Sequence, residues 1–123
     1  MHEQDSWVRN VAMNEPSFGD NTADADRLRR ALSQDTEPLP LYMDLDLIRR
    51  LPDLFRETGY RAQCCLFRDG QGFVLTGADA PEGKDWLGLA VDLGTTRYGL
   101  ALIDLVGGAE LARVSRDNPQ MRL

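Results

Sequence analysis

The sequence predicts an α+β protein: an extended arm and helix, a small strand-helix-hairpin domain, and three antiparallel strands. Apolar residues recur at helical spacing over residues 45–58 and alternate with polar residues over residues 60–67. Two further apolar runs, residues 86–91 and 98–105, are bounded by glycine-containing turns. The 123 residues, 42% hydrophobic and 28% charged, have the composition of a soluble globular chain of one or two small domains.

The first 21 residues are interpreted as an extended arm, because one short apolar alternation is followed by turn-forming residues. A helix is expected next, since Asn21 or Thr22 can cap its free N–H groups. Its apolar side chains form one narrow stripe, so this helix needs a partner surface. The segment 33–40 ends it.

The strongest helix signal follows a short strand at residues 41–43. Asp44 is the expected N-cap, and apolar positions recur over residues 45–58. Pro52 cannot donate its N–H, so we expect a kink or a division into two short helices. Gly59 can adopt the left-handed conformation that closes a helix.

A hairpin is predicted after this helix, with strands at residues 60–67 and 73–76 and a turn at residues 69–72. Cys64 and Cys65 are adjacent, so their side chains point to opposite faces of the strand. Two adjacent thiols are too few to hold an iron–sulfur cluster or a structural zinc ion. We interpret them as small hydrophobic residues in a reducing compartment.

The last part of the chain reads as three antiparallel strands at residues 86–91, 98–105 and 110–115. The first two are apolar on both faces, which is typical of strands covered on both sides. Little of this chain remains to cover a second face, so some of these side chains are expected to be exposed or paired between chains.

The charge of the chain bounds its partners and location. A formal net charge of −6 and a pI near 4.7 argue against nucleic acid or an anionic membrane as a partner. The sequence contains neither a transmembrane-length apolar run nor a basic leader followed by an apolar stretch. The expected location is the cytoplasm.

The segment between the first two of these strands carries the chemistry. A glycine lets the backbone approach a phosphate, threonine hydroxyls and backbone N–H groups can donate to its oxygens, and an aspartate can hold magnesium or its water. It is not a Walker A loop, because it contains no lysine and precedes a strand rather than a helix. An ordinary hairpin turn is the alternative interpretation. The residues concerned are Asp92, Gly94, Thr95 and Thr96.

The segment LGLAVDLGTTRYGLALIDL is similar to the first phosphate loop of the ATPase superfamily that includes acetate and sugar kinases, actin and related chaperones. In that superfamily the loop joins the first two strands of a ribonuclease-H-like domain. Four strings resemble, in this order, successive segments of the reductive activators of corrinoid proteins: NEPSFGDNTADADRLRRAL, DLIRRLPDLFRETGYRAQCCL, LGLAVDLGTT and ELARVSRDNPQMRL. Those activators carry a [2Fe–2S] ferredoxin-like domain, a linker, a middle domain and an ATPase domain.

The resemblance implies a division into a linker at residues 1–35, a middle domain at 36–84 and the first strands of a truncated ATPase domain at 85–123. By the same resemblance, Asp92 positions magnesium or water. The phosphate site would be lined by Gly94, Thr95 and Thr96.

Two further positions are notable in the light of the resemblance. Arg97 stands where many relatives have another threonine, and residues 118–120 resemble a family segment without an assigned role.

The function implied is that of a fragment of an ATP-dependent reductive activator, which restores cobalt(I) in a corrinoid partner protein. The cluster-binding cysteines and the second phosphate loop of the family are missing, so we expect this chain alone to bind no cofactor and to be catalytically incompetent. Magnesium-ATP and a [2Fe–2S] cluster belong to the full-length family. The alternative is a non-enzymatic interaction or dimerisation module, a homodimer formed through exposed strands.

Overall fold

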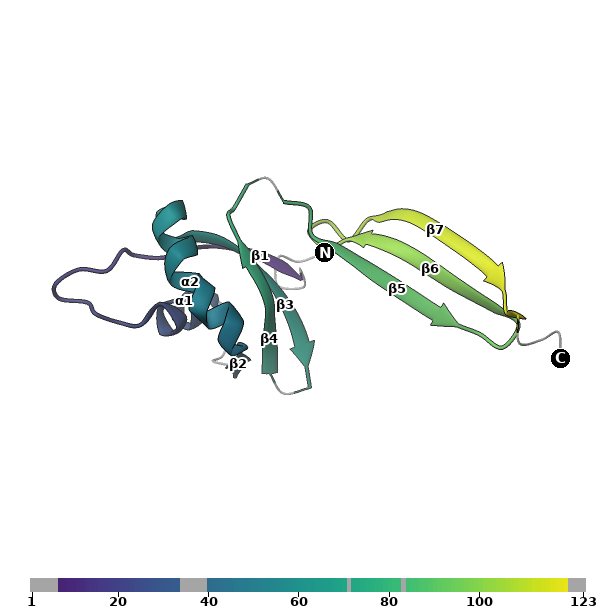
Figure 1. The fold of residues 1–123 in the computed structure, drawn as a ribbon, viewed down its shortest axis with the longest axis horizontal. Helices are drawn as coiled ribbons and strands as arrows, with labels where there is room; N and C mark the ends of the chain where they lie inside the picture. Colours follow the sequence, from purple (N-terminus) through teal and green to yellow (C-terminus); the bar gives the residue numbers. More distant parts are fainter. Residues whose placement is uncertain (1–6, 34–39, 71, 83, 120–123) are drawn as a thin grey trace. The chain divides into compact units, whose positions relative to one another are not determined.

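The computed structural model describes residues 7–33, 40–70, 72–82 and 84–119, which form two compact units. We call Trp7–Lys84 the helix-covered unit, and the unit that begins at Asp85 the three-stranded unit. Helices and mostly antiparallel strands occur together, so the predicted α+β class is confirmed (Figure 1).

The helix-covered unit contains a four-stranded sheet in the order β1-β3-β4-β2. The two central strands, β3 (Arg61–Asp69) and β4 (Gly72–Asp79), form the expected antiparallel hairpin. β2 (Leu41–Tyr42) pairs in parallel with β4 at one edge. At the other edge, β1 (Val8–Ala12) pairs antiparallel with β3, so the arm expected at the start of the chain supplies a strand of this sheet.

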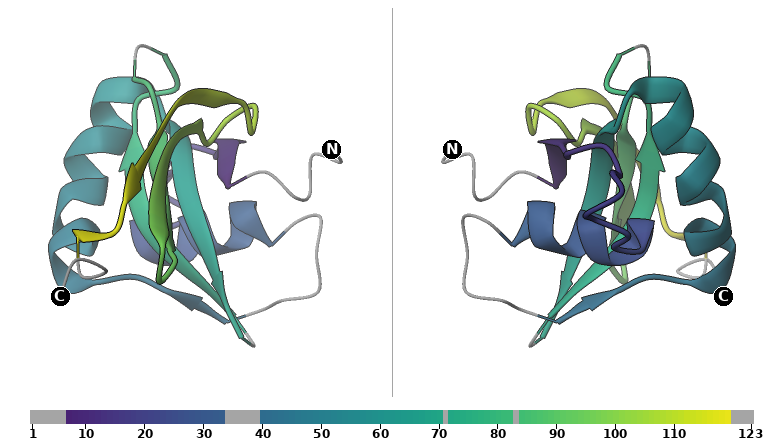
Figure 2. Two further views of the ribbon diagram at one scale, coloured as in Figure 1. Left: turned by 90° about the vertical axis from the view of Figure 1, so that its right-hand side faces the viewer. Right: turned by 90° about the vertical axis from the view of Figure 1, so that its left-hand side faces the viewer.

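Two helices cover one face of this sheet, α1 (Asp24–Leu32) and α2 (Leu45–Thr58) (Figures 1 and 2). Their apolar stripes meet alternate residues of β3, since successive strand residues face opposite sides. The result is one closed core within this unit. Its buried members are Leu28, Leu32, Leu47, Leu51, Phe55, Tyr60, Ala62, Cys64, Leu66 and Leu75.

Helix α2 begins and ends where its sequence predicts. The carboxylate of Asp44 accepts a hydrogen bond from the Leu47 N–H at 2.7 Å, and Gly59 closes the helix at φ 63°. The helix runs through Pro52 as one element instead of dividing into two. Pro52 removes a single backbone hydrogen bond, whereas Leu51 and Phe55 hold the helix on the core with almost no exposed surface.

Helix α1 begins differently from the prediction. Its N-cap is Ala23, which makes no side-chain cap bond, so the expected capping by Asn21 or Thr22 is wrong. The carboxylate of Asp20 instead accepts a hydrogen bond from the Thr22 N–H at 3.1 Å. The hydrogen bond between a backbone N–H and a side-chain oxygen therefore lies in the turn before the helix, and not at the helix N-cap.

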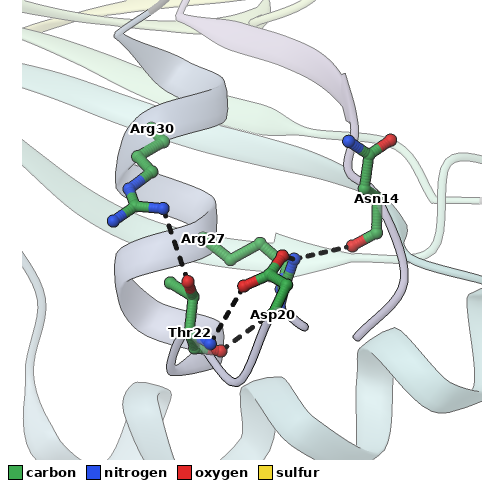
Figure 3. A network of polar contacts seen from close by, with 5 residues as sticks. All are labelled: Asn14, Asp20, Thr22, Arg27 and Arg30. Atoms are coloured by element: carbon green, nitrogen blue, oxygen red, sulfur yellow. Dashed lines mark hydrogen bonds and ion pairs between the residues drawn. The ribbon is translucent and has the colours of Figure 1, made fainter. Parts of the chain in front are cut away.

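Arg27 fixes this turn to α1 (Figure 3). Its side chain is buried, and its Nη1 donates to Asp20 Oδ2 at 2.7 Å and to the Asn14 carbonyl at 3.0 Å. Its Nη2 donates to the Thr22 carbonyl at 3.3 Å, and Arg30 bonds the Thr22 hydroxyl at 3.4 Å. The Arg27 hydrogen bond, followed by those from Thr22, holds the pKa of Asp20 well below its ordinary value.

The two cysteines are free and buried, as the interpretation of them as small hydrophobic residues requires. Cys64 belongs to the core, and burial raises the pKa of its thiol to about 12. A thiol with this pKa is not a nucleophile at neutral pH.

The three-stranded unit is an antiparallel meander of β5 (Leu87–Leu93), β6 (Arg97–Asp104) and β7 (Glu110–Asp117). Asp104 shapes its second turn, because its carboxylate accepts hydrogen bonds from the N–H groups of Val106 and Gly107. Neither helix in the described ranges is long and apolar enough to cross a membrane.

The two faces of this sheet differ, although the sequence suggested that both are apolar. One face of β5 carries Gly88, Ala90 and Asp92, opposite Ile103, Ala101 and Gly99 of β6. The other face carries most of the large side chains, and those from β5 are 48–80% exposed. The expected exposure of apolar strand residues is thus confirmed. The large β5 and β6 residues on this apolar face are Leu87, Leu89, Val91, Leu93, Tyr98, Leu100 and Leu102.

Candidate functional site

The expected phosphate loop is the turn between β5 and β6, formed by Gly94, Thr95 and Thr96. The Gly94 N–H donates to the carbonyl of Arg97 at 2.9 Å and closes the turn. A Cβ atom on Gly94 would lie 2.6 Å from that carbonyl oxygen, closer than real Cβ atoms come. Glycine is therefore required here for a close approach of two backbone segments.

Asn118 braces this loop from the end of β7. Its backbone N–H donates to the Thr96 carbonyl at 2.8 Å, and its side-chain Nδ2 donates to the Gly94 carbonyl at 3.1 Å. The resemblance of residues 118–120 drew attention to this segment without giving it a role. The sequence feature that could have indicated this role is an asparagine directly after the strand that pairs with β6. Gln120 lies outside the described residues.

The donor groups of the loop lie on Thr95 and Thr96. Within the described part of the chain, neither their amide N–H groups nor their hydroxyls have a hydrogen-bond acceptor, and both residues are exposed. Successive backbone N–H groups in a turn, together with hydroxyls, form a concave donor set that suits phosphate oxygens. The loop can therefore offer several donors to one anion.

Asp92 lies within β5 and not in the turn, where the sequence analysis had placed it. Its Cα partner is Gly99, which in turn pairs with Ser115, so Asp92 stands exposed on the face of the sheet that carries small residues. Magnesium commonly takes one or two protein carboxylates and completes its shell with water and phosphate oxygens. Asp92 fits the role of a single carboxylate ligand. Among the described residues, no cluster of three or more histidine, cysteine or acidic side chains could hold a metal ion by itself.

Two arginines of this sheet form ion pairs, Arg97 directly after the loop and Arg113 on β7. Arg97 begins β6 and donates from Nε to Asp117 Oδ1 at 3.0 Å in an exposed ion pair. Arg113 forms a two-point pair with Glu110 at 2.9 and 2.6 Å. Glu110, and more weakly Asp92, raise the pKa of Arg113, so Asp92 feels a cation on its own face of the sheet.

Comparisons with known proteins identify the family. The family model described as the RACo linker region matches residues 4–79, and the one described as the RACo middle region matches residues 87–123. No curated protein matches the chain. The two family models divide the chain into a linker region and a middle region at other residues than the expected division at 1–35, 36–84 and 85–123. The expected division stays a prediction.

A solved structure of a reductive activator for corrinoid, iron–sulfur protein shares the fold, with a TM-score of 0.78 and 22% sequence identity. The match covers 96% of this chain but only 19% of that chain. The linker model alone spans more than half of the present sequence. The chain therefore belongs to the family of reductive activators of corrinoid proteins, in which it corresponds to the linker and middle regions.

Proposed function

We propose that this chain serves as part of an ATP-dependent reductive activator that restores cobalt(I) in a corrinoid partner protein. The observation that carries the proposal is the match of two family regions, in order, to residues 4–79 and 87–123. The solved relative, whose name states activation of a corrinoid, iron–sulfur protein, supports it through its fold. The cytoplasm, a reducing compartment, is the location we propose.

Within this function, we assign phosphate contact to the turn between β5 and β6. Gly94 allows the backbone to come close to the anion, and Thr95 and Thr96 offer amide and hydroxyl donors. Asp92 would hold a magnesium ion or one of its waters near the same oxygens. Hydrolysis of bound magnesium-ATP would supply the free energy, and the loop residues would bind and orient the phosphate.

We also propose that the three strands are the opening edge of a ribonuclease-H-like ATPase domain, and that the 123-residue chain does not hydrolyse ATP. A single phosphate loop supplies one side of a nucleotide cleft. The [2Fe–2S] cluster would lie elsewhere in a full-length activator, since the described residues offer no cluster of metal-binding side chains.

A titration of the ¹⁵N-labelled chain with magnesium-ATP tests the phosphate assignment. Saturable shifts of the Thr95 and Thr96 amides at millimolar nucleotide are expected, with weaker changes around Asp92. A Gly94→Ala variant should lose them, because its methyl group meets the Arg97 carbonyl. Loop amides that do not shift at millimolar nucleotide would refute the assignment.

A second candidate function, self-association, has its own support. Large apolar side chains of β5 are exposed, and Leu111 and Val114 of β7, on the other side of β6, are exposed as well. Copies of the chain could bury them by pairing as a homodimer. Light scattering behind a sizing column is the measurement, and a monomer at all accessible concentrations would remove this candidate.

A further inference from the structure

The carbonyl groups of the loop pose a problem for phosphate binding. A short turn presents C=O as well as N–H groups, and carbonyl oxygens repel an anion. In this loop, two of these carbonyls are taken by one residue: Gly94 O by the Asn118 side chain and Thr96 O by the Asn118 backbone.

The consequence for the donors follows from peptide geometry. In a planar trans peptide the C=O of one residue and the N–H of the next point in opposite directions. Because the Gly94 carbonyl is directed at Asn118, the N–H of Thr95 is directed away from it. Asn118 thus controls the orientation of a donor that it does not touch.

The backbone of Asn118 is itself well anchored. Its N–H bond to Thr96 continues the β6–β7 ladder one residue past Asp117, where β7 ends. Pro119 disfavours a helical conformation of the residue before it and so favours this extended path. The ion pair between Arg97 and Asp117 joins the same two strand ends.

We propose that Asn118 is the positioning residue of the phosphate loop: it holds the loop carbonyls on the β7 side and keeps the Thr95 N–H on the ligand side. This inference rests on the proposed function. It adds a residue, remote from the Asp-Leu-Gly-Thr-Thr string, that sets the geometry of the site without contacting phosphate.

Asn118→Asp is the sharpest variant, because it has the same size but loses the Nδ2 donor and places a carboxylate against the Gly94 carbonyl. Asn10→Asp is the matched control: Asn10 is exposed on β1 of the helix-covered unit, and the charge change is identical. Asn118→Gln keeps an amide donor and serves as the rescue variant.

The first measurement uses no nucleotide. ¹⁵N relaxation should show lower order for Gly94 and Thr95 in Asn118→Asp than in the wild type, with partial recovery in Asn118→Gln and no change in Asn10→Asp. Strand amides of β6 should keep their shifts, which separates loop positioning from loss of fold. Unchanged loop order in Asn118→Asp would overturn the proposal.

The second measurement is the magnesium-ATP titration of the same variants. Loss of one hydrogen bond predicts about fivefold weaker binding for Asn118→Asp. Equal affinities would also overturn the proposal. A wild-type chain that binds no magnesium-ATP, while loop order still depends on Asn118, would contradict the proposed function and leave the positioning role supported.

Discussion

The two units use apolar residues in opposite ways. In the helix-covered unit, Phe55 is 0% exposed and Leu51 is 1% exposed, because two helices cover one face of the sheet. In the three-stranded unit, Leu89 is 63% and Leu93 is 80% exposed. The first unit has a core of its own, whereas the second presents an apolar face that a further surface would cover.

Because of this difference, the residues that stabilise the fold and the residues of the candidate site lie in different units. The free energy of folding is concentrated where apolar area is removed from water, in the helix-covered unit. The candidate phosphate loop lies in the other unit, directly after β5, whose large apolar side chains are exposed. A change at the loop should therefore alter binding with little effect on the core, and a core change should do the reverse.

The largest expected effect is that of Phe55→Ala, which removes a fully buried ring from the core. It should lower the free energy of unfolding of the helix-covered unit by about 3–5 kcal/mol. Urea unfolding followed by circular dichroism measures it. The same type of truncation at Leu89 should cost less than about 0.5 kcal/mol, since that side chain is already exposed. Equal losses at the two positions would contradict the comparison.

A smaller effect is expected from Asp44→Ala. This variant removes the side-chain acceptor for the Leu47 N–H at the start of α2, which should cost about 1 kcal/mol. The midpoint of urea unfolding should fall in proportion. Asp44→Ser, which keeps an acceptor, should restore most of the loss; no difference between alanine and serine would show that the cap bond contributes little.

The stability of the helix-covered unit should depend on pH through the hydrogen bonds of Asp20. The pKa of Asp20 is lower in the folded chain than its ordinary value of 3.8, chiefly through the Arg27 hydrogen bond. The unfolded chain therefore binds the proton more tightly, so this contribution is fully present above pH 3.8 and is lost as the pH falls below it. Urea midpoints at pH 6 and pH 3 measure the loss.

Asp20→Asn serves as the comparison, because it cannot titrate. Its midpoint should depend less on pH than that of the wild type. An identical pH dependence in the two proteins would mean that Asp20 is not the group responsible.

Local sequence signals located most elements because their causes are local. Asp44 and Gly59 marked both ends of α2 correctly, since a cap and a left-handed glycine act within one turn of the helix. The prediction of a division at Pro52 was wrong, because the core contacts that keep α2 continuous come from other elements. The cap expected at Asn21 or Thr22 was wrong: the N-cap is Ala23, and Arg27 of α1 bonds Asp20 in the preceding turn.

The candidate site also has features that the local sequence shows and features that depend on strand pairing. Gly94, Thr95 and Thr96 were recognisable as a turn from their own sequence. The place of Asp92 within β5 depends on how far the β5–β6 pairing extends, which the sequence of the turn does not show. The bracing by Asn118 depends on a contact between residues 24 positions apart, which no local pattern shows.

Native-state hydrogen exchange at residue resolution tests the contrast between the units most directly. Amides of β3 and α2 should exchange slowest, and those of β5 at least roughly 100-fold faster, because local opening costs least where few apolar contacts are broken. Equal protection of β3 and β5 would contradict the account, since it would mean that the three-stranded unit already possesses a closed core.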